Sequence, residues 1–519
     1  MTGPIYICFG FELETYSTKF IFLKLLLSIS QKRKEKKNKL KKTMTVAILL
    51  LSMVAFAAFP LSYTVEPTVP IAEEGDAYFV VFSGWELPAN VEAIIEGCGG
   101  RVAHKFPNVG VLVAVPITDP ATFEANLNRR PEIIDFGHDY VSEVPGDLVI
   151  VETEMESVPA VTDSCYWTYQ WHQWHTIDAS PTKAWSITTG SHDIKVAVLD
   201  TGIDYRHVDL APNYDFALSR SFVDYYNGTT EDEMDYNGHG SWCGGMVAAP
   251  INGRGTVGVG PNLDLVNLKV MNRYGWGYFS WDFDAIYYAV EHGINVVSMS
   301  FGAYVPMAGG AKKDGAALFS ALQRLFNYAN RKGIVCIASA GNLGLDMDGL
   351  YSIRHLPSQC SNVICVIGTD IYDDIAHTAW GSNYGSCLHG ISAPGGDYAS
   401  TEPAWYRTEY PTKPKYPTWV YYYGLCFSTY LVIGGLNYYA WMGGTSMAAP
   451  HVAGVAGLLL SINPEFTPSQ VKYFLRIGAE NIGDPGYDEY FNFGLLNAYN
   501  SLLKAVMSNI CRRLPVTTD

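Results

Sequence analysis

The sequence predicts an α/β fold with a doubly wound, mostly parallel sheet, preceded by a small ferredoxin-like α+β domain. From residue 167 onward, apolar runs alternate with helical patterns, and the runs span residues 194–200, 263–270, 294–300, 333–340 and 362–369. Continuous apolar strands with helical crossovers indicate parallel strands that helices cover on both faces. In sheets of this kind, ligands bind beyond the carboxyl ends of the strands.

Helix signals lie between these runs. Residues 282–293 and 316–333 have helical patterns that end in Gly293 and Gly333, where a C-terminal glycine is favoured. Near the end of the chain, Thr467-Pro468-Ser469-Gln470 forms a capping box and predicts a last helix through Ile477. These signals support the crossover helices of an α/β sheet.

A second, smaller unit precedes this region. We expect strands at residues 77–82, 100–105, 110–115 and 132–136, and helices at 90–98 and after Asp119-Pro120. That order is β-α-β-β-α-β, which is typical of a ferredoxin-like domain. Such a domain does not define a function by itself.

The N-terminal region predicts export. A basic segment at residues 32–42 precedes an apolar run at 46–58, and Ala55-Phe56-Ala57 suits signal cleavage after Ala57. A membrane anchor is the alternative, but the run is shorter than the ~20 residues that span a bilayer. Residues 1–43 are long for a leader, so translation starting further along the chain is a second alternative. The predicted parts are a leader (1–57), the small domain (58–140), an acidic exposed linker (141–165), the large domain (166–505) and a tail (506–519).

Charge and cysteine content narrow the class further. The formal net charge is −16, although the first 43 residues are basic, so the body of the protein is strongly acidic. An acidic body argues against nucleic acid as a partner and fits a binder of hard cations. Ten cysteines in 519 residues are too few for a disulfide scaffold. Cys336 and Cys365 lie in predicted core strands, where free thiols are expected, whereas five others lie in predicted loops and are candidates for pairing (Cys165, Cys360, Cys387, Cys426 and Cys511).

Three polar side chains at the ends of predicted elements form a candidate catalytic set. Asp200 closes the strand VAVLD, His239 begins a probable helix in GHGS, and Ser446 lies in GGTSMAAPH before a buried helix. We place Pro450 in the first turn of that helix, where a missing N–H is harmless. Singly, these residues have ordinary structural explanations: a loop cap, a turn histidine and a helix N-cap. Together they provide an acid, a base and a nucleophile.

The segments VAVLDTGID, GHGS and GTSMAAPHVAG resemble the three signature segments of the subtilisin-like serine peptidases (subtilases), over roughly residues 167–500. The resemblance implies that Ser446 is the nucleophile, His239 the general base and then acid, and Asp200 the carboxylate that orients the histidine. It also implies that Asn342 donates to the oxyanion, and that Ser300, Phe301 and Gly302 pair with extended substrate. The small domain and the linker resemble the family's inhibitory propeptide and its processing junction.

The sequence departs from the family's usual pattern near the histidine. Ser241-Trp242 stand where Thr and His are usual; serine keeps the hydroxyl, and we expect Trp242 to alter the rim of the site. Cys243 matches a position that also carries cysteine in the proteinase K branch, and we expect a buried spectator thiol. The aromatic stretch from Gly395 to Met442 is unusually long and either shields a substrate subsite or forms an ordered surface loop. Approximate alignment places His355 near the base of the main specificity pocket.

The resemblance also suggests structural calcium, with no catalytic cofactor. Asp209 and Asn252 match positions that bind Ca²⁺ in many relatives, and residues 224–235 resemble a second calcium loop. Clustered carboxylates and carbonyls suit this ion. The alternative is that the acidic loop is only a solvated surface.

The sequence therefore predicts a secreted serine endopeptidase, made as a zymogen, that hydrolyses peptide bonds through an acyl-enzyme. Its expected partners are protein or peptide substrates and its own propeptide, without nucleic acid or a stable membrane anchor. The alternatives are an inactive subtilase-like scaffold that binds peptides along residues 300–302, and the sedolisin type, which uses a glutamate base. The intact set Asp200, His239, Ser446 and Asn342 argues against both.

Overall fold

The computed structural model describes residues 5–6, 74–144, 148–153, 170, 173, 177–225, 229–307, 312–370, 381–396 and 424–513. These residues belong to one compact unit, Met1–Ile7 together with Ile71–Asp519. The second unit, Cys8–Pro70, contains most of the predicted leader and lies outside the described residues. Residues 154–165 of the predicted linker and residues 514–519 of the tail also lie outside the described residues.

The predicted parallel sheet is confirmed. Its seven strands have the order β16-β15-β13-β11-β7-β9-β8, and every neighbouring pair is parallel. The five apolar runs of the sequence form β7 (Lys195–Asp200), β9 (Asp264–Lys269), β11 (Val296–Met299), β13 (Val335–Ser339) and β15 (Val363–Thr369). Short edge strands β8 (Arg220–Ser221) and β16 (Ile391–Pro394) complete the sheet.

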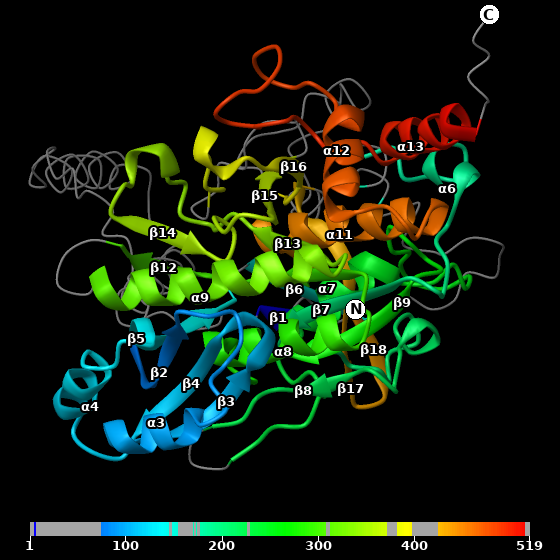
Figure 1. Cartoon of the computed structure of the whole chain (residues 1–519). Helices are drawn as coiled ribbons and strands as arrows, with labels where there is room; N and C mark the ends of the chain where they lie inside the picture. The colour runs from blue at the N-terminus through cyan, green and yellow to red at the C-terminus, as the bar shows by residue number, and fades with distance from the viewer. Residues whose placement is uncertain are drawn as a thin grey trace, which may run out of the picture. The chain divides into compact units, whose positions relative to one another are not determined.

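Helices cover both faces of this sheet (Figure 1). On one face Val196 and Val198 of β7 join a core with α7 (His239–Ala248) and α11 (Thr445–Ile462). On the other face Ala197 and Leu199 join a core with α8 (Phe279–Glu291) and α9 (Lys312–Arg331). Because successive strand side chains point to opposite faces, the continuous apolar runs serve both cores.

The small domain has the predicted ferredoxin-like order of elements. Its strands are β2 (Glu74–Phe82), β3 (Gly100–Phe106), β4 (Val111–Pro116) and β5 (Ile133–Glu143), with helices α3 (Val91–Cys98) and α4 (Pro120–Leu127). One face of this sheet packs on α3 and α4, and the other packs on α8 and α9 of the large domain. Asp119 caps α4 as predicted, because its Oδ1 accepts from the Thr122 N–H at 3.0 Å.

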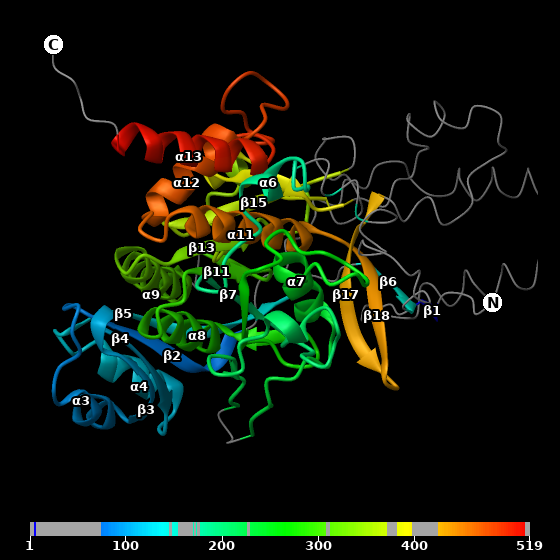
Figure 2. The ribbon, with the colours of Figure 1, turned by 90° about the vertical axis from the view of Figure 1, so that its right-hand side faces the viewer.

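The first part of the predicted exposed linker is instead built into sheets, so that expectation is wrong. Strand β5 continues to Glu143 and pairs in antiparallel fashion with β10 (Trp276–Tyr278) of the large domain. After residues 145–147, strand β6 (Leu148–Thr153) pairs with β18 (Leu436–Gly443). A four-stranded sheet of order β1-β6-β18-β17 results, with β1 (Ile5–Tyr6) and β17 (Cys426–Ile433) at its edges (Figure 2).

The C-terminal helices complete the large domain. The predicted capping box is present at the start of α12 (Pro468–Gly478), where Thr467 and Gln470 bond reciprocally. Cys511 lies in α13 (Ala498–Arg513), so its predicted loop setting is wrong. The remaining short elements are α6 (Ala184–Ile187), β12 (Ala303–Pro306) and β14 (Ile353–Leu356), besides a few 3-10 turns.

Helix α11 is the core helix expected after Ser446. In the described part of the chain it alone is long and apolar enough to cross a membrane, yet 89% of it is buried inside the protein. It begins at Thr445, which makes Pro450 an interior residue. Our placement of Pro450 in the first turn is therefore wrong, and the consequence for Ser446 is described below.

Candidate active site

Asp200 and His239 form a buried pair at the carboxyl edge of the parallel sheet. Asp200 is the last residue of β7, and His239 is the first residue of α7. Nδ1 of His239 lies 2.8 Å from Oδ1 and 2.9 Å from Oδ2 of Asp200. Both side chains are almost completely excluded from solvent. A carboxylate at Nδ1 fixes the tautomer, so this arrangement suits proton exchange through Nε2.

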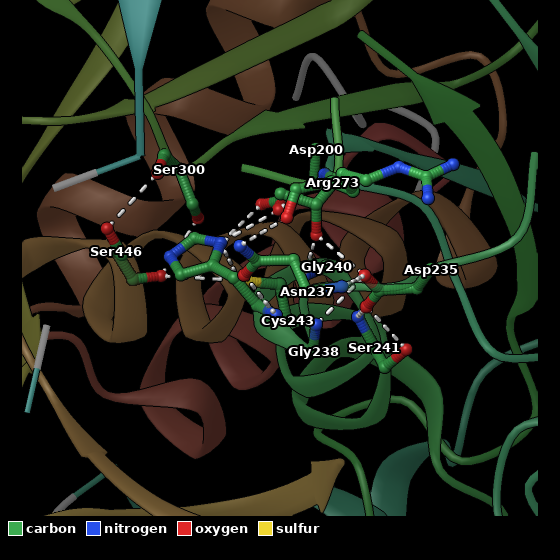
Figure 3. A network of polar contacts seen from close by, with 12 residues as sticks. Asp200, Asp235, Asn237, Gly238, Gly240, Ser241, Cys243, Arg273, Ser300 and Ser446 are labelled. Atoms are coloured by element: carbon green, nitrogen blue, oxygen red, sulfur yellow. Dashed lines mark hydrogen bonds and ion pairs between the residues drawn. The ribbon is translucent and has the colours of Figure 1, made fainter. Parts of the chain in front are cut away.

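Asp235 holds this pair in place and was not predicted to act at the site. Its Oδ1 accepts from Thr201 Oγ1 and from the N–H groups of Asn237 and Gly238, at 2.8 to 3.0 Å. Its Oδ2 accepts from the N–H and hydroxyl of Ser241 at 2.9 and 2.7 Å. The carboxylate therefore ties the turn before His239 to the residue that follows Asp200 (Figure 3). The sequence signal was an acidic residue four positions before the histidine, which we had included in a calcium loop.

Ser446 is the second residue of α11, beside the end of β11. Its hydroxyl donates to the carbonyl of Ser300 at 3.1 Å. In return, the Ser300 hydroxyl donates to the carbonyl of Ser446 at 2.8 Å. Pro450 explains this second bond, because proline has no N–H to give the carbonyl four residues earlier. The interior proline thus leaves the Ser446 carbonyl to Ser300, and both serines are drawn together at one side of the network (Figure 3).

Asn342 lies next to this helix start. Its Oδ1 accepts from the N–H of Thr445 at 2.8 Å and from the Thr445 hydroxyl at 2.7 Å. Because the backbone N–H can only donate, the amide atom facing it is the oxygen, and Nδ2 is the other end of the amide. The early N–H groups of α11 have no partner within the helix and carry the positive end of its dipole. Asn342 is therefore held at the start of α11, one residue before Ser446, by its amide oxygen.

The residues that follow His239 are fully buried. Ser241 keeps the hydroxyl expected at its position and accepts from the Asp204 N–H at 2.8 Å. Trp242 is 0% exposed and donates through Nε1 to the carbonyl of Ala440 at 2.8 Å. Our expectation that Trp242 alters the rim of the site is therefore wrong, because the ring lies beneath the β17–β18 hairpin.

Cys243 packs between the pair and the nucleophile. Its sulfur lies 3.9 Å from Nδ1 of His239 and 3.8 Å from the carbonyl of Ser446. Burial raises the pKa of the Cys243 thiol to about 11, so the thiol stays protonated at neutral pH. The side chains of Asp200, His239 and Cys243 are close enough to share a metal ion. The position and protonation of Cys243 fit the expected spectator thiol.

Gly302, in the segment that follows β11, pairs with the protein's own chain. Glu143 and Gly302 exchange two backbone hydrogen bonds of 3.2 Å in antiparallel fashion. The Val144 N–H donates to the carbonyl of Gly275 at 2.8 Å. The end of β5 therefore lies between two segments of the large domain.

His355, which we expected near the base of the main specificity pocket, lies beside Gly302 and Gly341. It belongs to β14, which pairs with β12, and its ring is 4.8 Å from the ring of Tyr304. A Cβ added to Gly302 would lie 2.5 Å from Cε1 of His355, and one added to Gly341 would lie 2.9 Å from its Nε2. The imidazole therefore fills the space between the chain-binding strand and the segment that carries Asn342. Burial lowers the pKa of His355 to about 4, which makes the ring neutral at neutral pH.

Asp209 and Asn252, the expected calcium ligands, contact each other. Asn252 Nδ2 donates to Asp209 Oδ1 at 2.9 Å, while Oδ1 of Asn252 accepts from the Arg254 N–H. Oδ2 of Asp209 accepts from the Thr256 N–H and the Tyr439 hydroxyl, each at 2.9 Å. These contacts engage both carboxylate oxygens of Asp209, and a calcium ion would need six to eight oxygen ligands there. Calcium at this position stays a prediction.

The fold and this buried Asp-His pair beside a helix-start serine define a serine peptidase of the α/β type. Comparison with known proteins agrees: the family model described as "Subtilase family" matches residues 191–494. The chain is 33% identical over 339 residues to the thermophilic serine proteinase of Bacillus sp. (strain AK1), covering 64% of this chain and 68% of that one. It is 32% identical to thermitase of Thermoactinomyces vulgaris, covering 62% of this chain and 92% of the relative. The chain belongs to the subtilase family and is a serine-type endopeptidase.

Solved structures show the same fold. The epidermin leader peptide processing serine protease from Staphylococcus aureus aligns with a TM-score of 0.64 at 22% identity, covering 85% of this chain and all of that one. Fervidolysin from Fervidobacterium pennivorans aligns with a TM-score of 0.60 at 20% identity, covering 83% and 61%. At these identities the likeness supports the fold alone.

Proposed function

We propose that this protein is an exported endopeptidase, made as a zymogen, that cleaves polypeptides through an acyl-enzyme on Ser446. The observation that carries the proposal is the bidentate contact of His239 Nδ1 with buried Asp200, beside a serine at the start of α11. The curated relatives named above are peptidases that share this family, and export is supported by the signal-like segment before Ala57. Its substrates are proteins or peptides.

In the proposed reaction, the Ser446 hydroxyl turns from the Ser300 carbonyl to Nε2 of His239 and gives up its proton as the oxygen attacks the substrate carbonyl. The imidazolium that forms is stabilised by Asp200, which stays ionised. His239 then protonates the departing amine, and the acyl group remains on Ser446. Water enters, His239 takes its proton, and the acid product leaves as the serine is restored.

The negative charge on the substrate oxygen would be met by two donors. One is the backbone N–H of Ser446, and the other is Nδ2 of Asn342. Thr445 fixes the Asn342 amide through its oxygen end, so the donor end needs no reorientation during the reaction. Donors aimed in advance at developing charge are among the largest contributions to catalysis.

We also propose that the small domain is an inhibitory propeptide whose end occupies the cleft. Val144 bonds to Gly275, Glu143 pairs with Gly302, and Leu148 pairs with Gly443, three residues before Ser446. Residues 145–147 connect these two docked segments. We therefore expect self-cleavage within residues 145–147, which narrows the processing region expected at 141–165.

The test is replacement of Ser446 by alanine, with Ser461→Ala as the matched control. Ser461 lies on the same helix, where its hydroxyl bonds to the Gly457 carbonyl. Ser446→Ala is expected to accumulate unprocessed chain, to lose peptide hydrolysis and to resist a fluorophosphonate label, while Ser461→Ala does none of these. Continued hydrolysis by Ser446→Ala would disprove the assignment, and an unlabelled, inactive parent would favour the inactive peptide-binding scaffold.

Structural calcium stays a prediction for this chain. Asp209 and Asn252 contact each other, and residues 226–228 of the second expected loop lie outside the described residues. No step of the proposed reaction uses a metal ion.

A further inference from the structure

The strand that leads to Ser446 has an edge to which a polypeptide is docked. β18 ends at Gly443, three residues before Ser446, and one of its edges pairs with β17. Its other edge pairs with β6 in antiparallel fashion, from Leu148 opposite Gly443 to Thr153 opposite Tyr438. Figure 2 shows β6 beside β18 of the β17–β18 hairpin. Six consecutive residues therefore lie along β18 by main-chain pairing.

The same chain is also paired at Gly302, two residues after Ser300, whose carbonyl accepts from the Ser446 hydroxyl. Val141, Ser142 and Glu143 pair with β10, and Glu143 also pairs with Gly302. Residues 144–147 connect these residues to β6 in the sequence. One polypeptide is thus paired in two places, at Gly302 and along β18, which ends three residues before Ser446.

Main-chain pairing of this kind favours substrates with an extended backbone and depends little on their amino-acid sequence. Affinity comes from backbone N–H and carbonyl groups, which every residue except proline provides in full. A six-residue strand spans about 20 Å. A compact folded domain does not offer a free strand of that length on each side of a bond, whereas an unfolded or locally extended segment does.

We propose that the edge of β18 is a docking strand for the substrate chain on the leaving-group side of the scissile bond, and that residues 148–153 are its first occupant. The preferred substrate is then a long extended segment, bound by its main chain over about six residues beyond the cleaved bond. This inference rests on the proposed peptidase function of Ser446. It extends the binding cleft from residues 300–302 to the whole length of β18.

The experiment uses the processed enzyme and synthetic peptides that begin at residue 136 of this sequence and end after residue 148, 150 or 153. The rate constant kcat/KM is expected to rise with each extension, by about fivefold for each hydrogen bond gained. In the longest peptide, single N-methyl groups are then placed at successive positions from 148 to 153. Because only alternate N–H groups of a strand face its partner, kcat/KM should fall at every second position, and the intervening positions are the matched controls.

Fluorophosphonate labelling of Ser446, measured in parallel, separates the two proposals. An enzyme that is labelled but cleaves all three peptides equally, or that is insensitive to every N-methyl group, overturns the docking strand and leaves the peptidase assignment intact. Hydrogen exchange of residues 438–443 in the processed enzyme is the second measurement. Full protection without added peptide would show that residues 148–153 stay bound permanently, which also overturns the proposal.

Discussion

The catalytic centre and the chain-binding cleft of this protein are built from different parts of the polypeptide. In the centre, buried side chains make the contacts, and Asp235 alone accepts five hydrogen bonds. In the cleft, strands β10 and β18 and residue Gly302 hold the chain by backbone pairing. The centre therefore depends on which residues are present, whereas the cleft depends mainly on where the backbone runs.

Outside the Asp-His-Ser set, the largest expected effect on stability is at Asp235. Asp235→Ala should lower the free energy of unfolding by ~3–5 kcal/mol, because five donors, four of them buried, lose their acceptor. It should also lower kcat/KM by ~10²-fold or more, since His239 is no longer held in position. Urea unfolding and peptide hydrolysis measure the two effects. Asp232→Ala, in the exposed part of the same loop, is the control, and equal behaviour of the two variants would contradict the role given to Asp235.

Substitutions of Asn342 test whether a side chain of the catalytic centre stabilises the transition state. Asn342→Ala should reduce kcat by ~10²–10³-fold with little change in KM, because the donor acts on the oxyanion and not on the bound substrate. Asn342→Asp keeps an acceptor for Thr445 and removes the donor, so it should be as slow while remaining folded. A loss confined to KM would show that Asn342 acts in substrate binding.

The catalytic residues could be predicted from the sequence, whereas the strand pairing of the chain around residues 141–153 could not. Asp200, His239, Ser446 and Asn342 stand in short local motifs, and the five apolar runs and the capping box at Thr467 are also local signals. The end of β5 and β6 had no such signal. Pro145, Gly146 and two acidic residues interrupt the alternation, and the strands exist because β10 and β18 provide partners from distant parts of the chain.

Two errors in the centre have the same origin. Trp242 was expected at the rim because the preceding motif is at the site, but the β17–β18 hairpin covers its ring. Asp235 was placed in an acidic calcium loop because composition does not tell which carboxylate turns inward. In both cases the contact that fixes the side chain comes from a segment distant in the sequence. Trp242 bonds to Ala440 and Asp235 bonds to Thr201, and local sequence patterns do not predict such contacts.

His355 provides a smaller, selective effect at the boundary between the two regions. His355→Ala should open the space between Gly302 and Gly341, so that larger apolar side chains before the cleaved bond gain ~10-fold or more in relative kcat/KM. Cleavage of a peptide library by parent and variant measures this change. Tyr304→Phe, which keeps the neighbouring ring but loses its hydroxyl contact with Asn383, is the control. An unchanged profile in His355→Ala would show that the imidazole does not limit the pocket.

The smallest expected effect is a pH dependence of stability. It comes from a side-chain contact between the end of β5 and helix α8. The hydroxyl of buried Ser142 donates to Oδ2 of Asp282 at 3.1 Å. Burial raises the pKa of Asp282 well above its usual range, and the negative charge of nearby Asp139 adds to the shift. Because the pKa is higher in the folded state than in the unfolded state, the stabilisation is complete at low pH. It is lost as the pH rises through the folded-state pKa.

Unfolding of the uncleaved Ser446→Ala chain in urea, followed from pH 5 to 9, measures this loss. The free energy of unfolding should fall by at most ~1.4 kcal/mol per pH unit from this group. Asp282→Asn in the same background cannot ionise, so its curve should be flatter and should gain on the parent as the pH rises. Parallel curves would mean that Asp282 is ionised in the docked chain, and that main-chain pairing holds this end of the cleft at every pH.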